Sequence, residues 1–564
     1  MHMGQKHFNK GELIKAAPYY TQAWQMDPHN DDLMTILAYV MNNMGARAQA
    51  IALLERLLKT KGLDCDILSM IGQLANDMRM YDIGEKVFRI FIDLYPQMTQ
   101  GYSGLATSLA GQDRQQESID LLQSVIPMFP EDANLWNTLA SHLNELGRGE
   151  DAITFFKESI RLDPENYRVF NNISLVYQGM GDIQSALEAL KECVKLNSDH
   201  PEPLMGLGTL ELTIGDLEKG WKNYAARKQI VSAKSNPHFL VNAEDWIEQD
   251  VSGKTVLIMG EQGIGDEVLF AFTFKGLYEQ AGKLIIGCDR RLVPTFQRTY
   301  PNADVYPHIT VEQHGFLYRA FPDMDKKIND GELKLDYKMQ FGDWAAHTWS
   351  SHDAFTFEPS KAFEVDPERA QYWKERLDAI SDRPKVGISW RSGNVKGLRA
   401  TYYPDLDDIK TILEVDGVDF INLQYGDCAE ELAELEKAGL KIHHFDDLDL
   451  FKDIDDQMAL INNFDLTIGP GSAPAAFSTS VGVPVWYLIM GYPWWGYDHR
   501  IPPHTPQSRL MITNASIPWR ELTTHAAACL KSYLNDGGTP AEAADSTPFP
   551  TTLADANNVG SHNP

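Results

Sequence analysis

Residues 135–164, LWNTLASHLNELGRGEDAITFFKESIRLDP, carry the pattern on which the prediction of the fold rests. Apolar residues recur about every 3.6 positions from Leu135 to Leu146 and again from Ile153 to Leu162, a spacing that favours two amphipathic helices. Gly147 lies between the two stretches and Pro164 follows the second, where a turn and a helix stop are expected. The segment therefore predicts a helical hairpin.

This hairpin recurs along the first part of the chain with a period of 34 residues. One column of the repeat is aliphatic, the next is small and a later one is large and apolar, as expected where helices press closely together. Stacked hairpins of this kind form a solenoid. The turn column is Pro28, Gly62, Pro96, Pro130, Pro164 and Ser198, the small column is Ala38, Gly72, Ala106, Ala140, Ser174 and Gly208, and the large column is Leu54, Phe88, Leu122, Phe156, Leu190 and Tyr224.

These columns resemble the tetratricopeptide repeat over residues 1–232, although Gly62 and Ser198 stand where the family has proline. The resemblance implies an all-α superhelix whose concave groove holds a protein or peptide partner. Polar side chains on the first helices of the hairpins are the candidate groove residues, namely Asn137, Asn171 and Asn172. A solvated polar face is an equal alternative for all three.

Composition excludes several classes of partner. The chain has 564 residues, with 50 basic against 79 acidic side chains and a net charge of −29. A negative field of this size repels phosphate backbones and anionic lipid, so no nucleic acid or membrane surface is expected as a partner. Five cysteines without a C-x-x-C pair favour a reducing, cytoplasmic location and predict no zinc site. The longest apolar region, 466–495, is interrupted by Gly and Pro, so no membrane span is predicted.

The repeat period ends near Gln229, and residues 233–252 are predicted to be a linker. The run Thr255–Met259 is typical of a short buried strand, and the glycine-rich segment Gly260–Glu267 follows it as a turn before a helix. Further strand candidates follow helical spacers. Residues 253–380 are therefore predicted to form a doubly wound parallel sheet.

A second unit of the same kind is predicted over residues 381–535. Its last glycine turn, Gly469–Ser472, joins a strand candidate to a helix of small residues. Ligands of open α/β sheets bind at the carboxyl ends of the strands, so the turns near Asp266, Arg391 and Ser472 are expected to face a cleft between two lobes. Residues 536–564 have little apolar content and are predicted to be disordered.

Four segments between about 240 and 530 together resemble the glycosyltransferase module that is often joined to tetratricopeptide repeats. This module is related to the heptosyltransferases and to protein O-glycosyltransferases, including bacterial flagellin glycosyltransferases with repeat domains. The resemblance implies a multidomain protein in which the repeats precede a GT-B fold of two Rossmann-like lobes. The segments are GEQGIGD (260–266), VGISWRSG (386–393), LQYGD (423–427) and DLTIGPGSAPAAFSTSVGVPVW (465–486).

The same resemblance implies metal-independent, inverting sugar transfer with Asp266 as the general base. Glu267 is the substitute base if Asp266 only stabilises the start of a helix. Gly471 and Ala476 depart from the family, whose members usually have an acidic residue and a downstream histidine in this block. Either the donor chemistry differs, or activity has been lost.

Donor binding is expected in the second lobe. The helix after Gly469, Gly471 and Ser472 offers free amides and a partial positive charge to a phosphate, although a glycine turn also serves as tight helix entry. Gln424 and Tyr425 follow a strand and are candidates for contact with the base or the ribose.

Basic and aromatic side chains add further candidates in this lobe. Arg391, Lys396 and Arg399 form a basic cluster in an acidic protein, and Arg391 is the first candidate for a phosphate contact. Solvated loop charges are the alternative for all three. The aromatic run between Tyr492 and Tyr497 is either a stacking platform or domain packing.

The leading hypothesis is a cytoplasmic glycosyltransferase that moves a sugar from a nucleotide-sugar to Ser or Thr of a protein recruited by the repeats. Flagellin is the first acceptor to name, on the resemblance alone. One alternative is transfer to a lipopolysaccharide or lipid-linked glycan, and another is a non-catalytic repeat scaffold or export chaperone with a decayed transferase fold. The choice among UDP, CMP and other nucleotides stays open, and no metal or other cofactor is expected.

Overall fold

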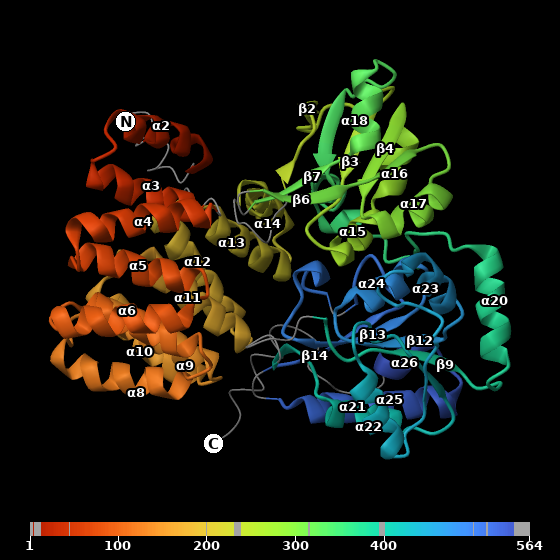
Figure 1. Cartoon of the computed structure of the whole chain (residues 1–564). Helices are drawn as coiled ribbons and strands as arrows, with labels where there is room; N and C mark the ends of the chain where they lie inside the picture. The colour runs from red at the N-terminus through yellow and green to blue at the C-terminus, as the bar shows by residue number, and fades with distance from the viewer. Residues whose placement is uncertain are drawn as a thin grey trace.

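The structure is a computed structural model in which an array of helices precedes two α/β lobes (Figure 1). The array, coloured red to olive, lies beside both lobes, which are coloured green and blue. Within the described part of the chain, no helix is both long and apolar enough to cross a membrane. The structure describes residues 4, 13–43, 46–198, 200–230, 238–313, 316–393, 401–499, 501–514 and 517–545.

The helical array consists of hairpins in which each helix packs on the next along the chain. Gly147, Gly181 and Gly215 close the turns of three successive hairpins with φ of 75°, 79° and 77°, in the left-handed region that favours glycine. Arg79 and Asp113 hold the equivalent turns of two earlier hairpins with φ of 60° and 62°. The helices are α2 (Leu13–Met26), α3 (Asp31–Asn43), α4 (Arg47–Lys61), α5 (Cys65–Asp77), α6 (Tyr81–Leu94), α7 (Thr99–Ala110), α8 (Gln115–Val125), η1 (Ile126–Met128), α9 (Ala133–Glu145), α10 (Gly149–Leu162), α11 (Tyr167–Gly179), α12 (Ile183–Leu196), α13 (Pro201–Thr213), α14 (Leu217–Tyr224) and η2 (Ala225–Gln229).

Phe88 of α6 shows how the repeat columns build the core. Its ring lies against Gly72 of α5 and Gly104 of α7, where a Cβ would overlap the ring. Phe88 is therefore almost completely buried. The predicted small and large columns meet where Gly72 contacts Phe88, and the prediction of stacked helical hairpins is confirmed.

The first lobe is built around a five-stranded parallel sheet of order β2-β8-β3-β4-β5. Its central strand β3 (Thr255–Met259) leads through the glycine-rich turn into α15 (Ile264–Ala271). A three-stranded sheet of order β1-β7-β6 lies at its side. The other elements are β1 (His238–Phe239), β2 (Glu244–Asp245), α16 (Phe274–Gln280), β4 (Lys283–Cys288), η3 (Arg290–Leu292), α17 (Val293–Thr299), β5 (Asp304–Pro307), β6 (Ile309–Gln313), β7 (Phe316–Ala320), α18 (Pro322–Asn329), β8 (Tyr337–Gln340), α19 (Phe341–Thr348) and η4 (His352–Ala354).

The second lobe holds a six-stranded parallel sheet of order β11-β10-β9-β12-β13-β14. All four residues of β12 (Leu466–Gly469) are buried, as expected for a central parallel strand covered on both faces. Strand β12 leads into α24 (Ala473–Ser480). The other elements are α20 (Pro367–Asp378), β9 (Lys385–Ile388), α21 (Leu406–Leu413), β10 (Asp419–Asn422), α22 (Ala429–Lys437), β11 (Ile442–His443), α23 (Ile454–Ile461), β13 (Val485–Met490), η6 (Trp494–Gly496), β14 (Arg509–Thr513), α25 (Trp519–Asp536) and α26 (Pro540–Asp545).

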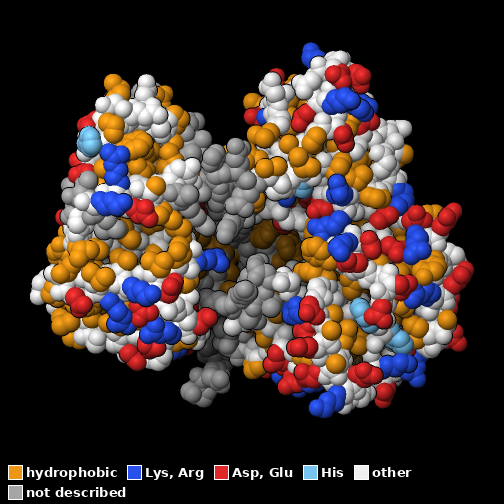
Figure 2. Space-filling view, in the orientation of Figure 1, with side chains coloured by type: hydrophobic (Ala, Val, Ile, Leu, Met, Phe, Trp, Pro, Cys, Tyr) orange, Lys and Arg blue, Asp and Glu red, His pale blue; other side chains and the backbone are white. Residues whose placement is uncertain are grey.

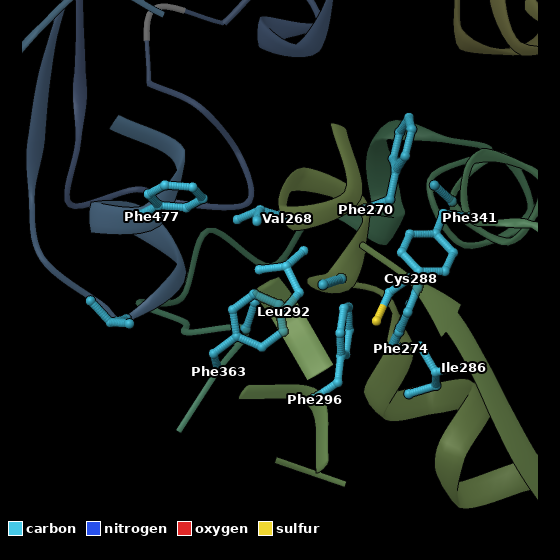
Figure 3. Close-up of a cluster of buried hydrophobic side chains, with 14 of the residues drawn as sticks. Val268, Phe270, Phe274, Ile286, Cys288, Leu292, Phe296, Phe341, Phe363 and Phe477 are labelled. Atoms are coloured by element: carbon cyan, nitrogen blue, oxygen red, sulfur yellow. The ribbon is translucent and has the colours of Figure 1, made fainter. Parts of the chain in front are cut away.

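One hydrophobic core continues from the last repeat through the first lobe into the second. Trp221 of α14, Phe270 of α15 and Phe477 of α24 all belong to it and are 5%, 0% and 2% exposed. Figure 3 shows the part of this core around Phe274 and Phe296, with Phe477 approaching from the second lobe. The last hairpin and the two lobes are thus packed together.

Two predicted boundaries around the first lobe differ from the structure. The predicted linker holds β1 and β2, which pair with β7 and β8 and so belong to the lobe. Helix α20 falls inside the predicted first lobe but packs on α23 of the second. Arg369 of α20 lies 2.7 Å from the carboxylate of Asp456 in α23, which fixes this packing.

The predicted disordered tail begins with an ordered helix. Ala544 of α26 is fully buried, and Arg509 of β14 forms an ion pair of 2.7 Å with Asp545. The short apolar stretch of this helix packs on α25, although the overall composition of the tail is polar. Residues 546–564 lie outside the described residues.

Candidate active site between the two lobes

The glycine turns of the two lobes meet at one cavity of about 140 Å³. Helices α15 and α24, which follow these turns, pack against each other. Because each helix begins at the carboxyl end of a parallel strand, its first turn faces the space between the lobes. The cavity wall includes Asp266, Ser472, Thr479, Tyr487, Trp495 and His504.

Asp266 supplies the acidic group of this cavity. It lies in the first turn of α15. Burial, with a smaller contribution from the nearby Glu261 carboxylate, raises the pKa of Asp266 to about 7. A carboxyl of this pKa binds and releases a proton near neutral pH, as a general base must. The arrangement is therefore able to take a proton from a hydroxyl bound in the cavity.

Glu267 does not reach the cavity. Successive residues of a helix point about 100° apart, and the Glu267 side chain turns into the first lobe. Its Oε2 accepts a hydrogen bond of 2.9 Å from the backbone N–H of Asp289, and burial raises the pKa of Glu267. Its carboxylate also lies against Gly260, where a Cβ would overlap it. Glu267 therefore holds the base of the turn instead of lining the cavity beside Asp266.

The start of α24 forms the opposite wall. Ser472 caps the helix by position, and its Oγ is buried with no hydrogen-bond partner among the residues that the structure describes. Gly471 lines the cavity with room for a Cβ, which would lie 3.8 Å from Ile489 Cδ1. Gly469 is different, because a Cβ there would lie 2.6 Å from Ser389 Oγ. Gly469 is thus required by packing on β9, whereas Gly471 and Ser472 face the cavity.

His504 completes the cavity wall, and no sequence pattern pointed to it. Its ring contacts the rings of Phe272, Trp349 and Trp495. Burial lowers the pKa of His504 to about 3, so the imidazole is neutral. Its Nδ1 is buried and makes no hydrogen bond within the described part of the chain. A neutral imidazole in this position is available to a hydroxyl of a ligand.

Arg391, the predicted phosphate contact, is paired with a carboxylate. Its Nε donates a hydrogen bond of 2.8 Å to Glu431 Oε1, and its Nη2 donates one of 2.7 Å to the carbonyl oxygen of Asp427. The indole nitrogen of Trp390 donates to the same carboxylate oxygen of Glu431, 2.9 Å away. A phosphate has to compete with Glu431 for this guanidinium.

Gln424 fixes the loop that carries Arg391. Its Oε1 accepts hydrogen bonds of 3.0 Å from the backbone N–H groups of both Trp390 and Arg391. Gln424 is almost completely buried, so this amide supports the loop after β9. Lys396 and Arg399, the remaining members of the predicted basic cluster, lie outside the described residues.

Tyr425 lines a second, larger cavity of about 510 Å³ near the carboxyl end of β10. Its ring stacks on that of Phe451 with 6.4 Å between the ring centroids. The backbone N–H of Gly393 donates to the Tyr425 hydroxyl, 3.1 Å away. The lining is acidic rather than basic, since it includes Asp427, Asp446 and Asp449.

The predicted groove residues lie on the first helices of neighbouring hairpins. Asn172 of α11 donates a hydrogen bond of 3.1 Å to the side-chain oxygen of Asn137 in α9. All three asparagines, including Asn171, are half-buried. The structure therefore links two of them to each other and leaves part of their hydrogen-bonding capacity facing outward.

The repeat domain also exposes apolar side chains. Figure 2 shows hydrophobic side chains gathered on the visible face of the solenoid. Ile51, Met80 and Ile83 are 36%, 36% and 37% exposed and surround an apolar pocket of about 170 Å³ between α4, α5 and α6. Exposed apolar patches of this kind mark sites of protein association.

The last repeat is attached to both lobes through aromatic side chains. The indole nitrogen of Trp221 donates to the carbonyl oxygen of Trp349, 2.8 Å away, and the Tyr224 ring stacks on Trp494 with 5.4 Å between centroids. Trp494 therefore belongs to domain packing, whereas its neighbour Trp495 lines the cavity. Domain packing is thus seen for Trp494, and a stacking platform at Trp495 stays a prediction.

Models of the tetratricopeptide repeat match residues 8–74, 104–167 and 167–200. The amino-terminal helical array is a tetratricopeptide-repeat domain. Such repeats present a surface to other proteins, so this domain is a protein-interaction module.

A relative is similar over a length greater than that of the repeat domain. Protein FlbA of Caulobacter vibrioides is 31% identical over 329 residues, which are 58% of this chain and 54% of that protein. The chain thus spans about half the length of this relative. A match of this length is longer than the repeat domain, so it includes part of the α/β lobes.

Two solved structures of tetratricopeptide-repeat proteins are similar to part of the chain. A thermophilic tetratricopeptide-repeat protein of Thermus thermophilus is 16% identical, with 32% of this chain and 99% of that chain covered and a TM-score of 0.30. YrrB, a tetratricopeptide-repeat protein with an unusual peptide-binding site, is 17% identical, with 33% and 96% covered and a TM-score of 0.22.

Proposed function

We propose that the chain is a glycosyltransferase of GT-B architecture that transfers a sugar from a nucleotide-sugar to Ser or Thr of a protein bound by the repeats. The cavity between the lobes carries the proposal. On one side it has a carboxyl with a pKa of about 7, and on the other the start of a helix with an unpaired serine hydroxyl within the described chain. A general base opposite an anion-binding helix terminus suits transfer from a phosphate ester to a hydroxyl.

In the proposed reaction, the ionised carboxylate of Asp266 takes the proton of the acceptor hydroxyl. The acceptor oxygen forms a bond to the anomeric carbon as the bond from that carbon to the phosphate oxygen breaks. The electron pair leaves with the nucleotide phosphate, whose negative charge is stabilised by the first-turn amides of α24 and the Ser472 hydroxyl. Attack opposite the leaving group inverts the anomeric configuration. The neutral imidazole of His504 holds a hydroxyl of the sugar or the acceptor.

Flagellin is the acceptor that we propose first, in the cytoplasm, on the resemblance to flagellin glycosyltransferases with repeat domains. The likeness to Protein FlbA is longer than the repeat domain and therefore includes part of the α/β half that carries the proposed site. The exposed apolar patch around Ile51 and Ile83 supports the recruitment of a protein with apolar side chains on its surface.

A thermal-shift panel with UDP, GDP, ADP and CMP tests the donor site. A ligand at 100 times its Kd stabilises a folded protein by about 2.7 kcal/mol, which is visible as a shift of a few degrees. We expect one nucleotide to raise Tm and the shift to weaken in Ser472→Ala and Arg391→Ala. Ser124→Ala on the exposed face of α8 is the control and keeps the shift. Mass measurement of a candidate acceptor after incubation with the matching nucleotide-sugar then tests transfer.

A non-catalytic repeat scaffold is the second candidate. It is favoured by the pairing of Arg391 with Glu431 and by the acidic lining of the larger cavity, both of which disfavour phosphate binding. This candidate predicts no Tm shift with any nucleotide. It also predicts that Asp266→Asn leaves the cellular phenotype of the protein unchanged.

A further inference from the structure

We infer that Arg227, at the end of the repeat domain, is a positioning residue of the proposed active site because it holds the turn that carries Asp266. The inference rests on the proposed role of Asp266. Arg227 lies in η2, directly after the last repeat helix, and is buried against the first lobe. It is therefore a contribution of the repeat domain to the site between the lobes.

Arg227 lies between two carboxylates of the first lobe. Its Nη2 is 3.1 Å from Glu261 Oε1 in the glycine-rich turn and 3.0 Å from Asp343 Oδ1 in α19. Its guanidinium also lies over the ring of Tyr224, 4.8 Å from the centroid. Arg227 and Glu261 are 2% and 4% exposed, so water does not replace these contacts. One buried cation thus joins the end of the repeats, the turn and α19.

The turn depends on Glu261 for its position. The Glu261 carboxylate accepts a hydrogen bond of 2.7 Å from the backbone N–H of Gly342 as well as those from Arg227. From the other side, Arg319 donates to the backbone carbonyl oxygens of Glu261 and Gln262. Glycines in the turn provide no side-chain anchor, so these two arginines set where α15 begins. Asp266 lies in the first turn of that helix.

The same cluster sets the charge around Asp266. Burial raises the pKa of Asp266 most, the carboxylates of Glu261 and Glu267 raise it further, and the Arg227 guanidinium lowers it. Across the cavity, the neutral His504 adds no charge. Removal of the Arg227 charge leaves Glu261 without its cation and therefore raises the pKa of Asp266 further. Arg227 thus acts on both the position and the proton affinity of the proposed base.

A deletion of the repeats is expected to affect the proposed active site as well as the binding of a partner. Removing residues 1–232 also removes Arg227 and Trp221, whose partners lie inside the first lobe. Loss of activity in such a deletion is then expected even with an acceptor that needs no recruitment. The role of Arg227 is therefore tested in the full-length protein.

The test compares full-length Arg227→Gln and Arg227→Lys with the wild type by hydrogen–deuterium exchange. Arg161→Gln, which breaks an exposed pair with Glu158 on α10, is the matched control. We expect exchange of the 260–266 turn to become about tenfold faster or more in Arg227→Gln, because a buried carboxylate loses its partner. Arg227→Lys keeps a charge and has a smaller effect, and the control leaves the turn unchanged.

The pH profile of sugar transfer gives the second measurement. Arg227→Gln moves its acidic limb to higher pH, and the double variant Arg227→Gln/Glu261→Gln moves it back, because both charges are then absent. If exchange of the 260–266 turn in Arg227→Gln equals that of the wild type, the inference is overturned. This holds even if the wild type transfers sugar. Absence of transfer by the wild type contradicts the proposed function instead, while faster exchange still supports the holding of the turn by Arg227. If Arg227→Gln does not fold, exchange of the turn and the pH profile are measured in Arg227→Lys and Glu261→Gln instead.

Discussion

The indole nitrogen of Trp221 and the carbonyl oxygen of Trp349 form a buried hydrogen bond of 2.8 Å between the last repeat and the first lobe. Trp221→Phe removes the donor and leaves a buried carbonyl without its partner. We expect the free energy of unfolding to fall by about 1–3 kcal/mol, as measured by urea denaturation. Trp136→Phe breaks an equivalent bond to Pro130 at an exposed position and serves as the control. If the free energy of unfolding falls equally in both variants, the Trp221–Trp349 contact is not specially important for stability.

Asp266→Asn keeps the shape of the proposed base and removes its ability to take a proton. We expect sugar transfer to fall by about a hundredfold or more, while nucleotide binding stays within a few-fold of the wild type. In the wild type, transfer rises with pH through about 7 as Asp266 ionises. A pH profile measured with saturating donor checks this limb. Full activity of the Asn variant excludes Asp266 as the base.

The raised pKa of Asp266 also affects stability. Because its folded pKa of about 7 exceeds the ordinary value of 3.8, the stability linked to its protonated form is present below pH 3.8 and is lost as the pH rises through 7. Asp266→Asn cannot ionise, so at pH 8 we expect it to be more stable than the wild type, by roughly 1–3 kcal/mol. Thermal unfolding at pH 5 and pH 8 measures the difference, which should be less than half as large at pH 5, because the loss starts at pH 3.8 and is complete only above 7.

His142 makes the repeat domain sensitive to acid. It is buried beside Ser118, with 2.6 Å between its Nδ1 and the serine Oγ, and burial lowers the pKa of His142 to about 4. Its contribution to stability is therefore present above pH 6.5 and is lost as the pH falls through 4. Relative to His142→Gln, the wild type should lose roughly 2–3 kcal/mol over this range. His29→Gln, at an exposed position, is the control variant.

Two glycines of one turn should respond differently to alanine. Gly469→Ala places a methyl group against Ser389, and we expect a loss of about 1–3 kcal/mol in stability. Gly471→Ala meets no close atom, so its stability should stay within about 0.5 kcal/mol of the wild type. If a phosphate approaches Gly471 in the cavity, the same variant nevertheless reduces the nucleotide-induced shift in Tm. Chemical denaturation and the thermal-shift panel separate the two effects.

The parts of the fold that repeat could be predicted from the sequence. The spacing from Leu135 to Pro164 indicates the helical hairpin, because a residue buried in one repeat is buried in the next. The strand, turn and helix around Gly469–Ser472 could be predicted equally well, since a short apolar run, glycines and small helix residues follow one another in the sequence. Helix α26 was missed because the polar composition of the tail outweighs its two buried alanines.

The partners of the site residues could not be predicted in the same way. Arg391 pairs with Glu431, which lies on α22, 40 residues further along the chain. No local sequence pattern predicts a contact between residues so far apart. His504 reaches the cavity from a loop without regular secondary structure, and its place in the cavity wall follows only from the packing around it. The direction of Glu267, in contrast, was available from helical geometry alone, since it is adjacent to Asp266.

The shared core of the last hairpin and the two lobes divides the chain into parts with unequal freedom to evolve. Helices α2 to α10 pack chiefly on their neighbours in the array, so recombination is able to lengthen, shorten or exchange them. The hairpin of α13 and α14 can change only together with the lobes that surround Trp221. Related proteins with different partners are therefore expected to differ by the gain or loss of whole early repeats. The packing of α13 and α14 on the α/β lobes is expected to stay the same among them.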